Sequence, residues 1–174
     1  MTHRTFTPFP ILTTERLTLR ELSLNDAQHI FALRSDREIN KYLDREPSKT
    51  IDEAIHFIHK IRALVKNNES VYWAITLTEN STFAGAICLY AFSDNPDKCE
   101  IGYELLSDFQ GKGIMHEAAN KVLGYAVQIL NIQIIEALTH KNNIHSIKLL
   151  EKLDFKKSIE SDKAETDYTI FTFG

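Results

Sequence analysis

Glu100-Ile-Gly-Tyr-Glu-Leu-Leu106, Ser-Asp-Phe and Gln110-Gly-Lys-Gly-Ile-Met115 follow one another in the second half of this chain. The first part alternates as a β-strand does, and the residues after Gly113 have helical spacing. A helix start leaves backbone N–H groups unpaired and carries partial positive charge, so it attracts anions. Gly111 and Gly113 permit a tight turn and a close approach of the backbone to phosphate oxygens. We therefore expect a strand, a turn and a helix start that bind a pyrophosphate-carrying cofactor.

This strand is the last of three β-rich runs, which are Val71–Leu77, residues 83–92 and residues 98–106. Polar turn residues separate them, with Glu79-Asn-Ser81 in the first gap and Ser93-Asp-Asn-Pro-Asp97 in the second. Connections this short predict an antiparallel meander. After the glycine turn, apolar residues share one face of a predicted helix, namely Ala119, Val122, Leu123, Ala126 and Leu130.

The N-terminal part of the chain predicts one strand and two helices. Residues 13–22 alternate and suggest a first strand. Asn25 or Asp26 can cap the helix that follows. The sequence Thr50-Ile-Asp-Glu53 matches a capping box, and a second helix follows it with apolar residues at Ala54, Phe57, Ile58, Ile61, Leu64 and Val65.

The C-terminal part predicts a strand, a helix and a last strand. Residues 132–138 are almost continuously apolar, as in a strand covered on both faces. Asn142 or Asn143 can cap the helix, and Tyr168–Phe173 alternates as a strand does. The order β-α-α-β-β-β-α-β-α-β predicts a mixed sheet with helices on its faces. With no linker or repeat, we expect residues 1–174 to form a single domain.

Composition excludes several classes of function. The net charge of −4 includes no basic block or stripe, so we expect no nucleic-acid partner. No apolar run approaches the roughly 18 residues of a membrane span, and the first ten residues contain no apolar core of a signal peptide. We expect a cytoplasmic protein that does not bind membranes.

Cysteines and histidines give no sign of a metal site. Cys88 and Cys99 fall in apolar strand-like runs without CxxC spacing, so buried structural thiols are expected. The histidine pairs are His56 with His59 and His140 with His145, and neither is joined by a carboxylate at metal-ligand spacing. We therefore predict that no metal is bound.

The glycine turn fits neither the dinucleotide GxGxxG motif nor the Walker A motif, because its spacing differs from both. It resembles the Q/R-x-x-G-x-G/A signature of the GNAT superfamily of acyl-CoA-dependent N-acyltransferases, with Met115 in place of the final small residue. Three further segments resemble the ribosomal-protein (Rim) acetyltransferase branch of that superfamily. They are Thr14-Glu-Arg-Leu-Thr-Leu-Arg20, Glu100-Ile-Gly-Tyr103 and Asn143-Ile-His-Ser146 with Leu150-Glu-Lys-Leu-Asp-Phe155.

The resemblance implies an α/β (α+β) fold with a mixed, mostly antiparallel twisted sheet, helices on both faces and a splayed pair of central strands. It also implies acetyl-CoA as a co-substrate, with pantetheine paired along Glu104, Leu105 and Leu106. Asn143 would hydrogen-bond the arm of the cofactor, although a helix N-cap is an equal alternative, and Ser146 would lie near the thioester. The backbone amides that would hold the pyrophosphate are those of Gln110, Gly111, Lys112, Gly113, Ile114 and Met115.

Acetyl transfer requires a neutral amine, and a carboxylate can remove its proton. Strand alternation places Glu100 and Glu104 on one face, so Glu100 is the first candidate base and Glu104 the second, the alternative being an exposed pair without a catalytic role. Many relatives have a Tyr on the last helix as general acid, and the matching position here is Leu150. Ser146 is the nearest polar substitute, unless it only caps or packs the first turn.

The expected activity is N-acetylation of a primary amine. The Rim resemblance favours a protein N-terminus as the acceptor. The alternatives are a polyamine or aminoglycoside and a non-catalytic CoA-binding regulatory domain. Tyr42, Trp73 and Tyr90 are candidate walls of an acceptor pocket, or otherwise core aromatics. The chain is expected to be a monomer or a homodimer.

Overall fold

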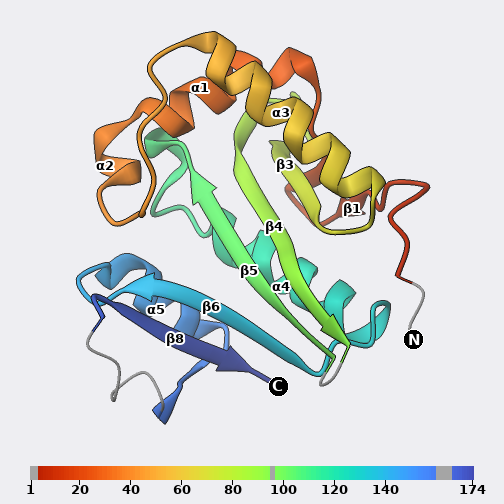
Figure 1. Cartoon of the computed structure of the whole chain (residues 1–174), viewed down its shortest axis with the longest axis vertical. Helices are drawn as coiled ribbons and strands as arrows, with labels where there is room; N and C mark the ends of the chain where they lie inside the picture. Colours follow the sequence, from red (N-terminus) through yellow and green to blue (C-terminus); the bar gives the residue numbers. More distant parts are fainter. Residues whose placement is uncertain (1–3, 95–96, 160–165) are drawn as a thin grey trace.

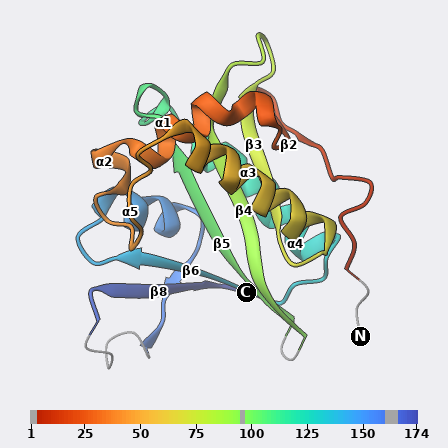
Figure 2. The same ribbon diagram turned by 45° about the horizontal axis from the view of Figure 1, so that its top comes forward.

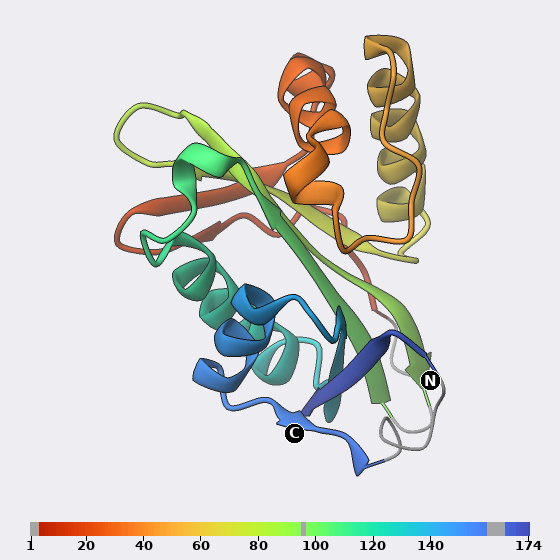
Figure 3. The same ribbon diagram turned by 90° about the vertical axis from the view of Figure 1, so that its left-hand side faces the viewer.

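An eight-stranded sheet with helices on both faces forms the molecule, as Figures 1 and 3 show. The computed structural model describes residues 4–94, 97–159 and 166–174. The turn predicted between Ser93 and Asp97 includes residues 95 and 96, which lie outside the described residues. In the described parts, no helix has both the length and the apolar character needed to cross a membrane.

The strands lie in the order β1-β2-β3-β4-β5-β6-β8-β7. Their bounds are Leu12–Thr13 for β1, Leu17–Glu21 for β2, Val71–Leu77 for β3, Phe83–Asp94 for β4, Asp97–Leu105 for β5, Ile134–His140 for β6, Lys156–Lys157 for β7 and Tyr168–Phe173 for β8. Among the described strands, β5 and β6 are the one parallel pair, and the others pair antiparallel. The mixed, mostly antiparallel sheet is therefore confirmed.

The parallel pair separates along its length. Its register pairs Lys98 with Ile134, Cys99 with Ile135 and Glu100 with Glu136, and β5 then continues to Leu105 without further pairing to β6. Figure 1 shows the two strands diverging from their shared lower end. This confirms the predicted splay and leaves the second half of β5 with an open edge.

Each face of the sheet has its own helices (Figure 3). The front face is covered by α1 (Ala27–Ser35), α2 (Arg37–Asn40) and α3 (Ile51–Lys66), and Phe57 of α3 packs edge-on against Tyr72. The back face is covered by α4 (Ile114–Gln128) and α5 (Ile144–Lys152). Trp73 points to this back face, where it packs against Tyr125 and donates to the Pro10 carbonyl at 2.7 Å. Trp73 is thus a core aromatic.

Two predicted helix caps differ in their contacts. A short 3-10 helix, η1 (Leu24–Asp26), precedes α1, and Asp26 is the residue before α1 but does not cap it. Its carboxylate instead accepts from Arg20 at 2.8 and 2.9 Å and from the Ser23 amide at 2.9 Å, because a buried carboxylate needs a cation. Half of the predicted Thr50–Glu53 capping box is present. The Thr50 side chain accepts from the Glu53 amide, but the Glu53 side chain accepts from the Lys49 amide and not from that of Thr50.

Strand β6 corrects the expectation that residues 132–138 are covered on both faces. It begins at Ile134, its buried residues alternate, and Leu138 on the front face is 56% exposed. The apolar run was misleading because α5 covers only the back of this part of the sheet. The sequence also gave no indication of α2, of β7 or of the hairpin that divides residues 13–22 into β1 and β2.

Candidate functional site

The glycine turn joins β5 to α4 through the 3-10 helix η2 (Ser107–Phe109). Gly111 and Gly113 have φ angles of 72° and 75°, a conformation that L-residues with side chains adopt at a cost. The amide of Glu117 donates to the Gly113 carbonyl at 3.0 Å and is the first to make the helical bond. The amides of Ile114, Met115 and His116 precede it, so they can bind an anion.

Met115 is accommodated without crowding this turn. Its side chain is 7% exposed and belongs to the hydrophobic core, as does that of Ile114. The volume added by methionine is therefore taken up between α4 and the sheet. The departure from the small residue of the signature does not disturb the helix start.

Arg16, between β1 and β2, binds to both the glycine turn and the first turn of α4. Its Nε lies 2.7 Å from Glu117 Oε2, and its Nη1 donates to the Lys112 carbonyl at 3.2 Å. Thr14 Oγ1 donates to the other Glu117 oxygen at 2.5 Å. Burial acts to raise the pKa of Glu117, but the hydrogen bonds from Thr14 and Arg16 outweigh it and lower that pKa. The sequence signalled this latch only as part of the Thr14–Arg20 resemblance.

The candidate residues for the cofactor arm lie along the end of β5 and at the start of α5. Gln110 donates its side-chain amide to the Leu105 carbonyl at 3.1 Å, which ties the turn to the strand, and Leu106 donates to Ala84 across the sheet. Asn143 Oδ1 accepts from the Ser146 amide at 3.2 Å, which confirms the helix cap. A contact of Asn143 with the cofactor stays a prediction.

Tyr103 is a site residue that sequence reasoning missed. Its hydroxyl lies 2.8 Å from Ser146 Oγ, and the pair spans from β5 to the first turn of α5. Burial raises the pKa of Tyr103 to about 12, and the hydrogen bond with Ser146 offsets part of that rise. Leu150, which matches the usual Tyr position, is fully buried. Tyr103 alternates with the glutamates along β5 and so faces the other side of the sheet, and nothing local in the sequence indicates its partner.

Glu100 and Glu104 share the front face of β5, as predicted. In the register they lie opposite Tyr90 and Ala86 of β4. Burial first, and then the Glu100 carboxylate with its hydrogen bond, raise the pKa of Tyr90. Glu104 instead forms an ion pair with Arg45, with 2.6 Å between Arg45 Nη2 and Glu104 Oε2. Glu100 is therefore the carboxylate better placed to accept a proton.

The segment between α2 and α3 bridges the open end of the splay. At one end Arg45 binds Glu104 of β5. At the other end the Tyr42 ring lies 5.2 Å from the His140 ring at the end of β6, and its carbonyl accepts from the Tyr168 hydroxyl at 3.4 Å. Figure 2 shows α2 and this connection above the splay.

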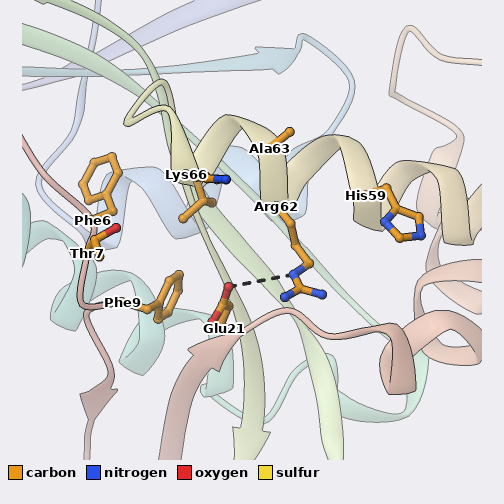
Figure 4. Close-up of a pocket in the computed structure, with 9 residues that line it drawn as sticks. Phe6, Thr7, Phe9, Glu21, His59, Arg62, Ala63 and Lys66 are labelled. Atoms are coloured by element: carbon orange, nitrogen blue, oxygen red, sulfur yellow. Dashed lines mark ion pairs between the residues drawn. The ribbon is translucent and has the colours of Figure 1, made fainter.

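A pocket of about 430 Å³ lies elsewhere, between the N-terminal segment and α3 (Figure 4). Its lining includes Phe6, Phe9, Glu21, His59 and Arg62, and no residue of β5, β6 or the glycine turn contributes to it. It has no part in the site above. Within the described residues, no three His, Cys, Asp or Glu side chains are grouped to hold a metal ion.

The chain is similar to known proteins over most of its length. The family model described as "Acetyltransferase (GNAT) domain" matches residues 16–156. The uncharacterized N-acetyltransferase YoaA of Bacillus subtilis is 33% identical over 86% of this chain and 84% of its own. Two solved structures share the fold at lower identity. The ribosomal alpha-N-protein acetyltransferase RimL in complex with coenzyme A has a TM-score of 0.82 at 18% identity, covering 94% of this chain and 97% of that one. Spermidine N-acetyltransferase from Vibrio cholerae, in complex with CoA and spermine, has a TM-score of 0.79 at 21% identity. The match covers 92% of this chain and 96% of that one.

Proposed function

The chain belongs to the acetyltransferase (GNAT) family, and we propose that the amine it acetylates is the N-terminus of a protein. It is an acetyl-CoA-dependent N-acetyltransferase, and acetyl-CoA is its co-substrate. The observation that carries the proposed site is the open edge of β5 after Glu100, which leads directly to the unpaired amides of α4. The arm of the cofactor can pair with the open edge of β5 while the pyrophosphate binds to the unpaired amides at the start of α4.

The residues of this chain divide the work of binding as follows. The glycine turn supplies the amides of residues 111–116 to the pyrophosphate, because the Gln110 amide already donates to the Ser107 carbonyl at 3.2 Å. Arg16 holds this turn in place. The edge at Glu104, Leu105 and Leu106 pairs with pantetheine. Asn143 and Ser146 border the arm from α5. Acetyl-CoA supplies the acetyl group and its thioester, and the chain orients both.

Glu100 takes the proton from the attacking amine. An α-amino group has a pKa near 8, against about 10.4 for a lysine side chain, so a protein N-terminus needs less help at neutral pH. A carboxylate in position contributes roughly 10²–10⁴-fold to such a step. Glu100 faces the front of the sheet, from which the acceptor approaches, and it is in no ion pair within the described residues.

Tyr103 donates a hydrogen bond to the departing sulfur. Its pKa of about 12 exceeds the roughly 8.5 of an ordinary thiol, so it holds its proton more tightly than the thiol does. It therefore stabilises the thiolate without giving the proton up. Ser146 orients the phenol from the other side of the splay.

A small polyamine is the second candidate acceptor. It is favoured by the uncompensated charge of Glu100 on the acceptor side, which would attract a cation. A protein N-terminus is also cationic before it loses its proton, so this charge alone does not choose between them. The front helices and the segment after α2 would select the acceptor, since one fold hosts many acceptors.

Release of free CoA thiol over a panel of N-terminal peptides and small amines tests the proposal. We expect peptides to be acetylated on the α-amine with kcat/KM above that of spermidine. Glu100→Gln should lower kcat at least about 100-fold while the Kd of acetyl-CoA stays within twofold. Transfer confined to spermidine would contradict the proposed acceptor, and unchanged turnover in Glu100→Gln would contradict the proposed base.

A further inference from the structure

Two buried donors on the acceptor side have no acceptor among the described residues. Arg34, at the end of α1, lies with its guanidinium carbon 4.0 Å above the Phe57 ring, and its Nε is buried and unpaired. The hydroxyl of Tyr72, a residue 7% exposed, is also buried and unpaired. Phe57 packs against Tyr72 with ring centroids 5.9 Å apart, and the charges of Arg34 and Tyr72 each shift the pKa of the other group, so the two donors lie near one another. Buried donors without partners are costly, so each calls for an explanation.

A second guanidinium faces the same spot. Arg45 is bound to Glu104 on one side and donates to Asn40 Oδ1 at 2.6 Å on the other. Asn40 is itself buried and donates to two backbone carbonyls of α1 and its C-terminal end, which fixes the position of Arg45. Burial, and after it the charge of Arg45, lower the pKa of Arg34. Two cations therefore share the carboxylate of Glu104.

Other charges near the spot do not compensate Arg34. Of the groups that shift the pKa of Arg34, Glu53 has the smallest effect. The Glu53 carboxylate is exposed and accepts from the Lys49 amide at 2.7 Å. On the same face, Lys98 and Glu136 neutralise each other at 2.7 Å, as Arg45 and Glu104 do. Neither Arg34 nor Glu100 has an ion pair within the described residues. One excess positive and one excess negative charge thus remain on the acceptor side.

Gly102 lies on β5 between Glu100 and Glu104, the carboxylate that the two arginines share. It lies in one row of the sheet with Cys88 and Tyr72. A Cβ at this position would lie 3.2 Å from Cys88 Sγ and 3.4 Å from the Tyr90 ring. Adjacent strands are about 4.8 Å apart, so Tyr72 on β3 lies roughly 10 Å from Gly102 across the sheet. Glu100 lies two residues, about 7 Å, further along β5, so it is roughly 12 Å from Tyr72. An acceptor that reaches both must be extended, with several bonds between its amine and its anionic group.

We propose that Arg34, Arg45 and Tyr72 form a subsite for a carboxylate or phosphate carried by the acceptor. The subsite rests on the proposed function, because the amine of the same molecule would lie at Glu100. It names the substrate class: an extended amine with an anionic group several bonds away. In a protein acceptor the anion is an acidic side chain beside the N-terminus. In a small acceptor it is the carboxylate of a long ω-amino acid or the phosphate of a long aminoalkyl phosphate. Spermidine has no such group.

Matched acceptor pairs test the subsite. They are peptides with Glu or Gln as the second residue, a long ω-amino acid and its amide, and a long aminoalkyl phosphate and its alcohol. We expect kcat/KM at least about tenfold higher for the anionic member of one pair, mainly through KM, since a charge-assisted hydrogen bond is worth at least that factor. The pair that shows the preference identifies the source of the anion. Equal kcat/KM within every pair would overturn the subsite.

Variants separate the subsite from general charge effects. Arg34→Gln should abolish the preference and leave the neutral member within about twofold of its original kcat/KM. Arg62→Gln is the matched control, because Arg62 lies on α3 beside Glu21 and outside this cluster. It should retain the whole preference. Loss of the preference in Arg62→Gln as well would show that overall charge, and not this cluster, selects the acceptor.

Binding measurements make the subsite independent of turnover. The N-acetylated products of each pair are titrated calorimetrically into the CoA-bound protein. A preference for the anionic product that Arg34→Gln removes supports the subsite, even where no amine is acetylated and the proposed acceptor class fails. Equal affinity for both products of every pair would overturn the subsite whatever the turnover shows.

Discussion

Tyr103 on β5 and Ser146 on α5 are joined by a 2.8 Å hydrogen bond between their hydroxyl oxygens. Tyr103 belongs to the strand whose open edge borders the splay, and Ser146 belongs to the first turn of the helix beside it. Leu150 fills the place of the tyrosine that many relatives carry on this helix, and it is fully buried. A phenol is therefore supplied from the strand where the helix has none.

Tyr103→Phe removes the donor to the departing sulfur. We expect kcat to fall about 10–100-fold, because one preorganised donor to developing charge is worth roughly that much or more. The Kd of acetyl-CoA should change less than threefold. Single-turnover acetylation measures the chemical step and titration calorimetry measures the affinity. Ser146→Ala leaves the phenol present but less well oriented, so its kcat should lie between those of the wild type and Tyr103→Phe. A kcat unchanged in Tyr103→Phe would exclude this role.

Gly113→Ala strains the glycine turn. Gly113 has a φ of 75°, and a left-handed conformation costs an alanine about 1–2 kcal/mol. We expect the turn to shift and the Kd of CoA to rise at least about tenfold. Gly124→Ala is the matched control, since Gly124 lies within α4 and an added Cβ meets nothing within 4 Å. That variant should keep its CoA affinity and gain about 0.5–1 kcal/mol of stability. Equal CoA affinity in both variants would count against the turn as the pyrophosphate site.

Asp26→Asn breaks the buried pair with Arg20. Burial acts to raise the pKa of Asp26, but the hydrogen bonds and charge of Arg20, together with Ser23, lower it overall. A carboxyl with a lowered folded-state pKa stabilises fully above its unfolded value of about 3.9, and that contribution is lost as pH falls through the folded-state value. We expect a loss of about 2–3 kcal/mol at pH 7. Urea unfolding should show the two proteins converging below about pH 4. A difference that stays constant with pH would refute the assignment.

Cys88 and Cys99 should react slowly with thiol reagents. Burial, with the Glu104 charge as the next cause for Cys88, raises the pKa of each thiol to about 12. The thiolate is the reactive form, so at pH 8 both should be modified at less than about one hundredth of the rate of a cysteine peptide. Labelling followed by mass spectrometry measures this, with rapid labelling in denaturant as the control. Rapid labelling of either native cysteine would show that its strand opens readily.

Periodicity and turn residues predicted much of the fold. The meander of β3, β4 and β5, helices α3 to α5 and β8 follow from local patterns, and the splay came from the resemblance. The missed elements are short. Helix α2 has four residues and β7 has two, too few for a period to show. The apolar run at residues 132–138 wrongly predicted a strand covered on both faces. Whether a strand face is covered depends on which helices pack against it, and none of the described helices covers Leu138.

The sequence likewise predicted the local parts of the candidate site but not the contacts between distant residues. The glycine turn and the Asn143 cap are local, so the sequence indicated them directly. The partners of Tyr103 and Glu104 are not local, since Ser146 lies 43 positions from Tyr103 and Arg45 lies 59 from Glu104. Pairings across such separations depend on how the helices pack on the sheet. The ion pair between Arg16 and Glu117 joins residues 101 positions apart, so local sequence patterns could not predict it.

A crystal structure of the protein with acetyl-CoA tests the central claim most directly. We predict pyrophosphate oxygens within hydrogen-bonding distance of the amides of residues 111–116, pantetheine along the edge of β5 after Glu100, and the thioester sulfur next to the Tyr103 hydroxyl. Pyrophosphate density away from the glycine turn, or an arm that lies outside the splay between β5 and β6, would contradict the account.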